Sequence, residues 1–430
     1  MSFDGHLDQN DGWSVSGWAF DRDRPNEPVE VEVELSSGFT GRVRADEFRA
    51  DLLAHGVGNG RHGFVYRLPL EWKSPAVETI TARIKGTSFT LNGSPMSRQS
   101  RALVELVAGD IVNNCNLRCP FCIVDYANVK GLKLMTLETF KRSLDLLPIT
   151  KPGNFWLSCL HEPTLNPQFI DFIEAVPDAY RDRISFTTNL AKRLSDELLE
   201  RLANSGIHSI RVSFDSRDPA AFARLRQNGK YEIFADNLAR LSARLKTSRR
   251  RPVLHFITMA FKDNYREIAD LVRHGRELGS TIHEIRYIYY VPHVAHWGKE
   301  HILNAAEWAE LERMLAPVAA TGHLSVAGPV NGTREQFEEE RGLADYVARE
   351  TSFGGSQDPA HMVVPDPAVI GRMLPDEALR LRMRWDGVMM TEQISEDLFR
   401  VNINKLEYSA AYFASLRVAA MGKALEAVEG

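Results

Sequence analysis

The chain has 430 residues, more than a single hydrophobic core usually organises, so two or three domains are expected. Its composition, 44% hydrophobic and 25% charged with a net charge of -5, is that of a globular protein and favours no nucleic-acid partner. The start has no signal-peptide pattern and no stretch approaches about 18 apolar residues, so we expect a cytoplasmic protein without a membrane span.

Residues 1–98 predict a small antiparallel domain, similar to a β-sandwich. Turn-forming residues cluster at 21–28, 56–63 and 92–95, and residues 29–35 alternate between apolar and acidic side chains. The segment resembles β modules attached to bacterial glycosyltransferases, which implies a carbohydrate-binding or partner-binding role. Its aromatic residues are Trp13, Trp18, Phe20 and Phe64. They could form a surface on which sugars stack, but aromatic residues in a small β domain belong more often to the hydrophobic core.

Residues 101–300 predict a partial (β/α)6 barrel of the TIM type, an α/β fold in which short apolar runs alternate with helical patterns. Active sites of such sheets lie at the carboxyl ends of the strands. The six expected strands are 102–111, 154–159, 183–188, 209–215, 253–260 and 284–291. The expected helices include 137–147, 168–175, 196–204, 232–246 and 265–278, with Thr136, Ser195 and Asn264 as N-caps.

Residues 301–430 predict a mixed α/β extension that caps the barrel. Helical patterns are found at 306–318 and 332–349, and residues 354–367 are rich in glycine, proline and aspartate.

Cysteine is rare and clustered, because three of the four cysteines lie within eight residues: Cys115, Cys119 and Cys122. Such clustering fits a metal or cluster site in a reducing compartment better than disulfides. The three thiolates can hold three corners of a [4Fe-4S] cluster and leave the fourth iron open. The alternative is a zinc site completed by a residue such as His161.

The string CNLRCPFC, followed by a parallel βα pattern, resembles the radical S-adenosylmethionine (SAM) superfamily. The resemblance covers about residues 103–295 and implies a [4Fe-4S] cluster whose open iron binds SAM. Glu162 and Pro163 match the family's Gly-Gly-Glu-Pro loop, whereas Leu160 and His161 replace its glycines. The resemblance implies that the cofactors are bound by Phe121, Glu162, Pro163, Thr188, Asn189, Ser213, Asp215 and Arg226.

Three residues are candidates for catalysis because they lie at the ends of predicted strands, at the barrel mouth. Cys159 is a candidate hydrogen-atom donor, substrate ligand or methyl carrier, against the alternative of a small buried residue. His161 is a candidate acid or base, against a hydrogen-bonded structural role. Tyr290 is a candidate for substrate contact, with His293 close to it in sequence.

The core resembles the molybdenum-cofactor enzyme A type without its cysteine-rich C-terminal extension, because no cysteine follows Cys159. This implies a single cluster and a one-electron donor such as flavodoxin or ferredoxin. The N-terminal module favours a substrate of surface-polysaccharide assembly, such as a sugar or nucleotide sugar. The alternatives are a radical SAM enzyme that modifies a peptide or protein, and a non-catalytic binding protein stabilised by an iron–sulfur cluster or zinc.

Overall fold

A computed structural model describes the arrangement of most of the chain. The residues described are 2–10, 14–68, 78–98, 103–158, 160–287, 292–319, 324–327, 363–374, 379–391, 393–394 and 399–416. No helix in these ranges combines the length and the apolar composition that crossing a membrane requires.

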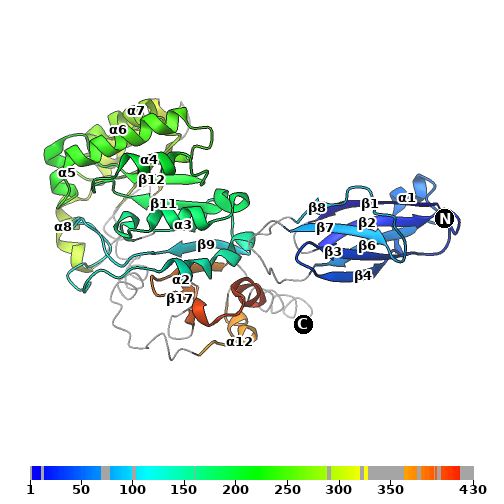
Figure 1. Ribbon diagram of the computed structural model, residues 1–430. Helices are drawn as coiled ribbons and strands as arrows, with labels where there is room; N and C mark the ends of the chain where they lie inside the picture. The colour runs from blue at the N-terminus through cyan, green and yellow to red at the C-terminus, as the bar shows by residue number, and fades with distance from the viewer. Residues whose placement is uncertain are drawn as a thin grey trace.

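The N-terminal strands form two four-stranded antiparallel sheets that share one apolar core (Figure 1). The first sheet has the order β1 (Phe3–Asn10), β2 (Ser14–Asp21), β6 (Arg61–Arg67) and β5 (Glu47–Phe48), with α1 (Ala50–Ala54) between β5 and β6. The second has the order β4 (Thr40–Arg44), β3 (Glu30–Leu35), β7 (Thr79–Ile84) and β8 (Met96–Ser97).

Strand β3 shows why the alternating pattern gives a two-layered structure. Val31 and Val33 are fully buried between the sheets. Glu32 and Glu34, whose side chains lie on the other face of the strand, pair with Arg42 and Arg83 of the neighbouring strands.

The central sheet confirms the partial barrel, and each of the six predicted strands is present. They run parallel and in chain order as β9 (Val104–Gly109), β10 (Phe155–Trp156), β11 (Ile184–Thr188), β12 (Ser209–Ser213), β13 (Val253–Met259) and β14 (Ile282–Arg286). A further parallel strand, β15 (Leu324–Ala327), pairs with β14. The predicted end of the sixth strand at residue 291 is wrong, because the strand stops at Arg286 and Tyr287 already lies beyond it.

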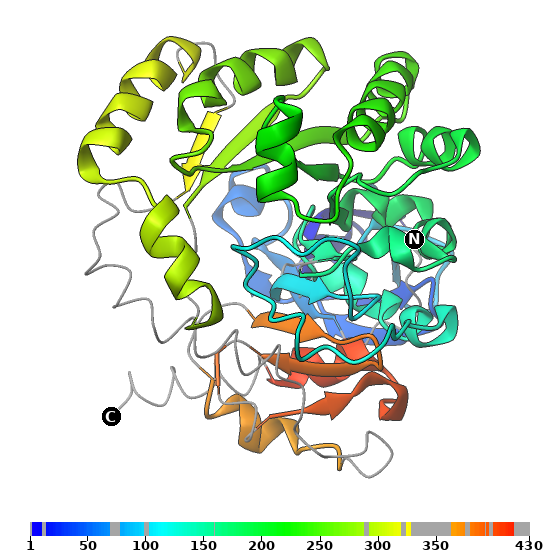
Figure 2. The ribbon, with the colours of Figure 1, turned by 90° about the vertical axis from the view of Figure 1, so that its left-hand side faces the viewer.

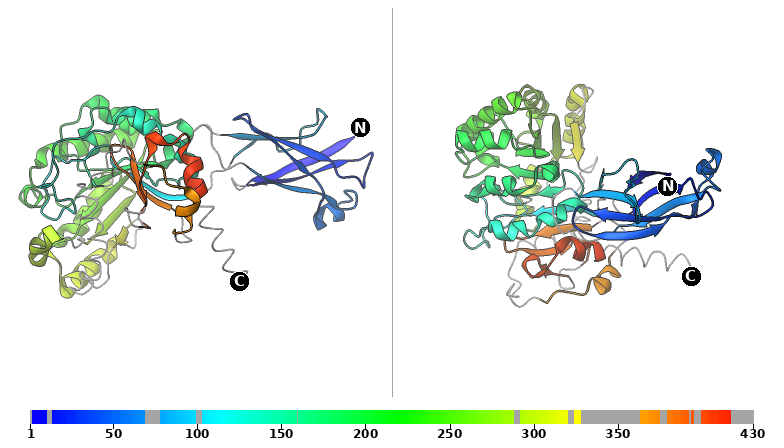
Figure 3. Two further views of the ribbon diagram at one scale, coloured as in Figure 1. Left: turned by 90° about the horizontal axis from the view of Figure 1, so that it is seen from below. Right: turned by 45° about the vertical axis from the view of Figure 1, so that its right-hand side comes forward.

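The C-terminal segment adds strands to the other edge of this sheet. Strand β16 (Leu379–Met383) pairs in parallel with β9, and β17 (Val388–Thr391) and β18 (Val401–Asn402) continue the sheet antiparallel. Figure 3 shows these orange and red strands beside the cyan strand β9. The helical pattern at 332–349 lies outside the described residues.

Helices cover the outer face of the curved sheet, as Figure 2 shows for the green and yellow part of the chain. The α-helices are α2 (Leu137–Lys141), α3 (Phe169–Ala175), α4 (Asp196–Ala203), α5 (Pro219–Leu225), α6 (Tyr231–Thr247), α7 (Ile268–Glu277), α8 (Ala295–His301), α9 (Ala305–Ala319) and α12 (Pro367–Gly371). The short 3-10 helices are η1 (Leu144–Ile149), η2 (Pro163–Leu165), η3 (Asp178–Arg183), η4 (Tyr265–Glu267), η5 (Pro292–Val294) and η7 (Ile403–Lys405).

Two of the three predicted N-caps are confirmed. Thr136 and Ser195 accept hydrogen bonds from the backbone N–H groups of Thr139 and Leu198. Asn264 occupies the predicted N-cap position before η4 but makes no side-chain capping hydrogen bond, because its buried amide donates to the carbonyls of Asp215 and Met259. Asn264 therefore joins the ends of β12 and β13.

Candidate functional site

The three clustered cysteines lie on the loop after β9, and all three line one pocket of about 140 Å³. Figure 2 shows this cyan loop in front of the strand ends. Six further residues predicted for the site line the same pocket: His161, Glu162, Thr188, Asn189, Ser213 and Arg226. The structure thus gathers side chains from four strand ends around the thiols.

The chemistry of the donors fits an iron–sulfur cluster. Asn189 Nδ2 lies 3.4 Å from Cys115 Sγ, and the Leu117 backbone N–H donates to the same sulfur over 3.4 Å. Arg226 Nη1 lies 3.7 Å from Cys119 Sγ. Hydrogen bonds of this kind to the sulfurs are one of the means by which proteins set the potential of an iron–sulfur cluster.

Burial disfavours free thiolates at this site. It raises the pKa of Cys115 and of Cys122 to about 12, and it raises the pKa of Cys119 as well. A bound metal supplies the positive charge that deprotonates such a thiol.

The zinc alternative requires ligand atoms that converge on one metal ion. In the ranges that the structure describes, no three His, Cys, Asp or Glu side chains converge closely enough to hold one metal ion. In a [4Fe-4S] cluster each cysteine binds a different iron, so such convergence on one ion is not required.

Glu162 is the buried centre of the loop that follows β10. Its carboxylate accepts hydrogen bonds from Thr164 Oγ1 (2.7 Å), Thr188 Oγ1 (2.9 Å) and the Asn189 backbone N–H (2.8 Å). Burial raises the pKa of Glu162, and these hydrogen bonds act in the opposite direction. Glu162 therefore ties the end of β11 to the loop and holds Asn189 against Cys115.

Asp215 and Arg226, both predicted to bind cofactor, form a buried pair. Arg226 Nε and Nη2 each lie 2.5 Å from Asp215 Oδ2, and the Met259 backbone N–H donates to Oδ1. Burial by itself lowers the pKa of Arg226, but the charges of Asp215 and Cys119 outweigh burial and raise it. Asp215 thus positions a permanent cation beside Cys119.

The loop that lacks the expected glycines is fixed by side chains from other elements. Asp110 Oδ1 accepts hydrogen bonds from the backbone N–H groups of Leu160 (3.1 Å) and His161 (3.3 Å). Tyr126 Oη donates to the Leu160 carbonyl (3.2 Å) and lies 3.1 Å from His161 Nδ1. Ser158 Oγ donates to the His161 carbonyl. Leu160 and His161 are therefore held in a defined conformation without glycine.

The remaining predicted residues lie elsewhere or outside the described residues. Phe121 is buried in an apolar cluster with Phe261 and Trp297, at ring distances of 4.7 and 5.6 Å. Pro163 begins the short helix η2. Cys159 and Tyr290 lie outside the described residues, so their catalytic roles stay predictions.

Four residues that line the pocket are not among the predicted site residues: Leu117, Tyr126, Leu160 and Thr187. Leu117 and Thr187 adjoin predicted site residues in the sequence, so their position near the pocket was predictable. Tyr126 follows Cys122 by four residues, and only the folded loop brings its hydroxyl to His161. His293 Nε2 also reaches this loop, 2.8 Å from the Cys122 carbonyl oxygen.

Residues 110–275 match the model of the Radical SAM superfamily. Residues 110–275 are therefore similar to a radical SAM domain, and the superfamily of that domain uses a [4Fe-4S] cluster and SAM. This domain contains every residue of the pocket just described.

Particular relatives match only part of the chain. It is similar to GTP 3',8-cyclase 3 of Mycobacterium bovis, with 22% identity over 56% of this chain and 64% of that protein. It is also similar to a probable GTP 3',8-cyclase of Methanocaldococcus jannaschii, with 25% identity over 41% of this chain and 57% of that protein. The chain thus spans less than two thirds of either relative. The Streptococcus suis SuiB structure bound to SAM aligns with a TM-score of 0.48 and 14% identity, over 74% of this chain and 69% of that one.

Proposed function

We propose that this protein is a radical SAM enzyme whose cluster is held by Cys115, Cys119 and Cys122 and whose substrate is a polar metabolite. The observation that carries the proposal is the pocket in which the three thiols meet Glu162, Asn189 and Arg226. With a cluster and SAM bound there, reductive cleavage of SAM yields a 5′-deoxyadenosyl radical that takes a hydrogen atom from an unactivated carbon.

The chain's own residues have positioning roles in this reaction. Asn189 and Arg226 face the cysteine sulfurs. Glu162 holds the Asn189 backbone N–H, and Asp215 holds the Arg226 guanidinium. Both carboxylates are buried, so water does not compete for the hydrogen bonds that position these two residues.

A polar substrate is supported by the inner face of the sheet. Leu254 and Phe256 belong to the core, so His255 between them faces the barrel interior. There His255 Nε2 lies 3.2 Å from Glu284 Oε2, and the Arg211 guanidinium lies 4.3 Å from the centre of the Trp156 ring. Such side chains suit the hydroxyl and phosphate groups of a sugar or nucleotide sugar better than an apolar molecule.

Anaerobic reconstitution tests the proposal. We expect about four iron and four sulfide ions per chain, and 5′-deoxyadenosine by mass spectrometry after reduction with dithionite in the presence of SAM. Alanine at Cys115, Cys119 or Cys122 should abolish both. Cys159→Ala is the matched control and should keep the cluster.

The outcomes separate the alternatives. A cluster without SAM cleavage under any reductant indicates a non-catalytic binding protein stabilised by an iron–sulfur cluster. Zinc in place of iron indicates a non-catalytic binding protein stabilised by zinc. Incubation with nucleotide sugars and with peptides, followed by a search for mass changes, distinguishes the two classes of substrate.

A further inference from the structure

A short exposed segment lies directly beside the cysteine loop. The Asn114 side chain donates to the Gly131 carbonyl (3.2 Å), and the Lys133 backbone N–H donates to Asn113 Oδ1 (2.6 Å). The Asn113 N–H donates back to the Lys133 carbonyl (3.2 Å), and Val112 pairs with Leu134 as an isolated bridge. Residues 131–134 are therefore fixed against the residues that immediately precede Cys115.

The surface of this segment is basic with an apolar centre. Leu132 and Leu134 expose 48% and 37% of their surface, and Lys130, Lys133 and Arg118 are exposed around them. We call these five residues the basic loop face. The only acidic residue between positions 113 and 134 is Asp125, whose carboxylate accepts hydrogen bonds from Ala127 N–H and Asn128 Nδ2.

The charge of this face is opposite to that of the whole chain. With three basic residues and one acidic residue, residues 113–134 carry a formal charge of +2, whereas the chain carries -5. An acidic protein is therefore repelled by the molecule as a whole and attracted at this loop. The two exposed leucines provide the apolar contact that a protein interface has at its centre.

We propose that the basic loop face docks an acidic one-electron carrier protein, such as a flavodoxin, which reduces the cluster. This inference rests on the proposed function. In the step, one electron leaves the carrier and enters the cluster, and no covalent bond forms or breaks. A carrier bound at this face lies close to the cluster, because the backbone of Gly131 and Lys133 is hydrogen-bonded to Asn114 and Asn113, the two residues before the ligand Cys115.

The test compares a protein donor with a small one. The reconstituted full-length protein is mixed in a stopped-flow instrument with reduced flavodoxin or with dithionite, and bleaching of the cluster absorbance is followed. Lys130→Glu/Lys133→Glu should slow reduction by flavodoxin about tenfold at low salt and weaken its dependence on ionic strength. Reduction by dithionite should stay unchanged.

A matched control carries the same change of charge at the other end of the barrel. Arg249 and Arg251 are exposed and precede β13, at the amino-terminal edge of the sheet. Arg249→Glu/Arg251→Glu should reduce at the wild-type rate with both donors. Lys130→Gln/Lys133→Gln, which only neutralises the face, should give an intermediate rate and provides a second variant if the reversal disturbs folding.

Each result decides between the proposals. Flavodoxin rates within twofold of wild type in both variants of the face, or equal slowing in the control, overturn the docking proposal alone, provided that dithionite reduces the cluster and SAM is cleaved. A protein that binds no cluster, or that never cleaves SAM, overturns the proposed function and with it this inference.

Discussion

At the scale of single residues, the hydroxyl of Tyr126 fixes the loop in which Leu160 and His161 replace the expected glycines. It contacts both the Leu160 carbonyl and the His161 ring, and it is held by Arg118, whose guanidinium lies 4.7 Å from the centre of the tyrosine ring. The conformation of residues 160 and 161 thus depends on a hydroxyl from the cysteine loop.

Tyr126→Phe should weaken SAM binding without loss of the cluster. The change removes the hydroxyl that contacts Leu160 O and His161 Nδ1, an effect of about 1–2 kcal/mol. If the loop holds SAM, its affinity should fall about tenfold, measured by calorimetry on the oxidised protein and by the change that SAM causes in the EPR signal of the reduced cluster.

The control is Tyr412→Phe, which removes another hydroxyl that donates to a carbonyl, that of Pro365, over 2.9 Å. Tyr412→Phe should leave SAM affinity unchanged. Equal SAM affinity in Tyr126→Phe and wild type would show that the hydroxyl does not support the cofactor.

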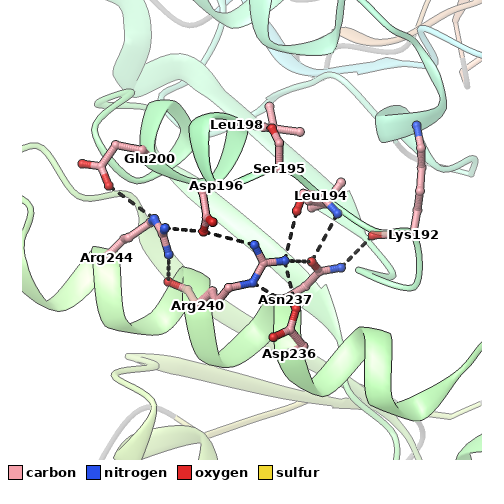
Figure 4. A network of polar contacts seen from close by, with 10 residues as sticks. All are labelled: Lys192, Leu194, Ser195, Asp196, Leu198, Glu200, Asp236, Asn237, Arg240 and Arg244. Carbon is pink, nitrogen blue, oxygen red and sulfur yellow. Dashed lines mark hydrogen bonds and ion pairs between the residues drawn. The ribbon is translucent and has the colours of Figure 1, made fainter.

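At the scale of elements, Asn237 on α6 determines the path of the chain after β11. Its Nδ2 donates to the Leu190 carbonyl over 2.8 Å. Nδ2 also donates to the Lys192 carbonyl (2.6 Å), and Oδ1 accepts from Leu194 N–H and from Arg240, as Figure 4 shows. Leu190 has a φ of 50°, which a leucine rarely adopts. The buried amide therefore holds a strained turn directly after Asn189.

Asn237→Ala should lower the free energy of unfolding by about 2–3 kcal/mol, because several buried partners lose hydrogen bonds. Urea unfolding measures this change. Asp236→Ala, an exposed neighbour on the same helix, is the control and should change stability by less than about 0.5 kcal/mol. Similar losses in the two variants would mean that helix α6, and not the amide, is responsible.

Asp145 links the C-terminal segment to the barrel and should make stability depend on pH. Its Oδ2 accepts from the Ser409 N–H over 2.7 Å, and burial raises its pKa to about 6. The unfolded chain has a value near 3.9, so the folded protein binds more protons between about pH 4 and pH 6. The contribution of Asp145 to stability therefore falls as pH rises through this window.

Asp145→Asn should remove that dependence. The amide oxygen still accepts from Ser409, and no charge is buried at neutral pH. We expect the variant to gain up to about 3 kcal/mol relative to wild type between pH 4 and pH 7, measured by urea unfolding at several pH values. Parallel curves for the two proteins would contradict the assignment, and Asp236→Asn controls for the loss of a surface charge.

The helices and strands that could be predicted from the sequence are those set by patterns of neighbouring residues. The six strands β9 to β14 follow each other in sequence and pair with their neighbours, so the alternation of apolar runs and helices located them. Strand β16 pairs with β9 across more than half of the chain, and nothing local indicates such a partner. Asn264 shows the same limit, because a sequence with a capping pattern does not reveal a buried acceptor on another strand.

The same reasoning applies to the site. Spacing located the cysteines, and the resemblance to the radical SAM family located Glu162, Asn189, Ser213 and Arg226. The first three also lie close to the carboxyl ends of predicted parallel strands, which meet at one edge of the sheet. The pairing of Asp215 with Arg226 and the contact of Tyr126 with His161 depend on loop conformations. These contacts required the folded structure.

At the scale of the whole molecule, a buried ion pair of the N-terminal sheets lies close to side chains of the barrel. Glu78 precedes β7, Arg98 follows β8, and Arg98 Nη1 lies 2.7 Å from Glu78 Oε2, with 1% and 3% of the two side chains exposed. Burial lowers the pKa of Arg98, and Glu78, Tyr180 and Tyr408 act in the opposite direction. Tyr180 belongs to the barrel core and Tyr408 packs against it, so the pair lies where the two parts of the chain meet.

Such a pair favours one arrangement of the N-terminal sheets relative to the barrel, because an unpaired charge in a buried site lowers the free energy of unfolding. Glu78→Gln and Arg98→Met should each lower the free energy of unfolding by about 3 kcal/mol. The double variant should be less destabilised than the sum of the two and should approach the wild type, since it buries no charge. Differential scanning calorimetry measures both the stability and whether the single variants unfold in two separate transitions.

The exposed pair Lys85–Glu30 in the same sheets is the control, and breaking it with Lys85→Met should lower stability by less than about 1 kcal/mol. Additive losses in the Glu78 and Arg98 variants would mean that the two side chains do not act as a pair. A single transition with unchanged stability in both single variants would mean that other contacts hold the N-terminal sheets to the barrel.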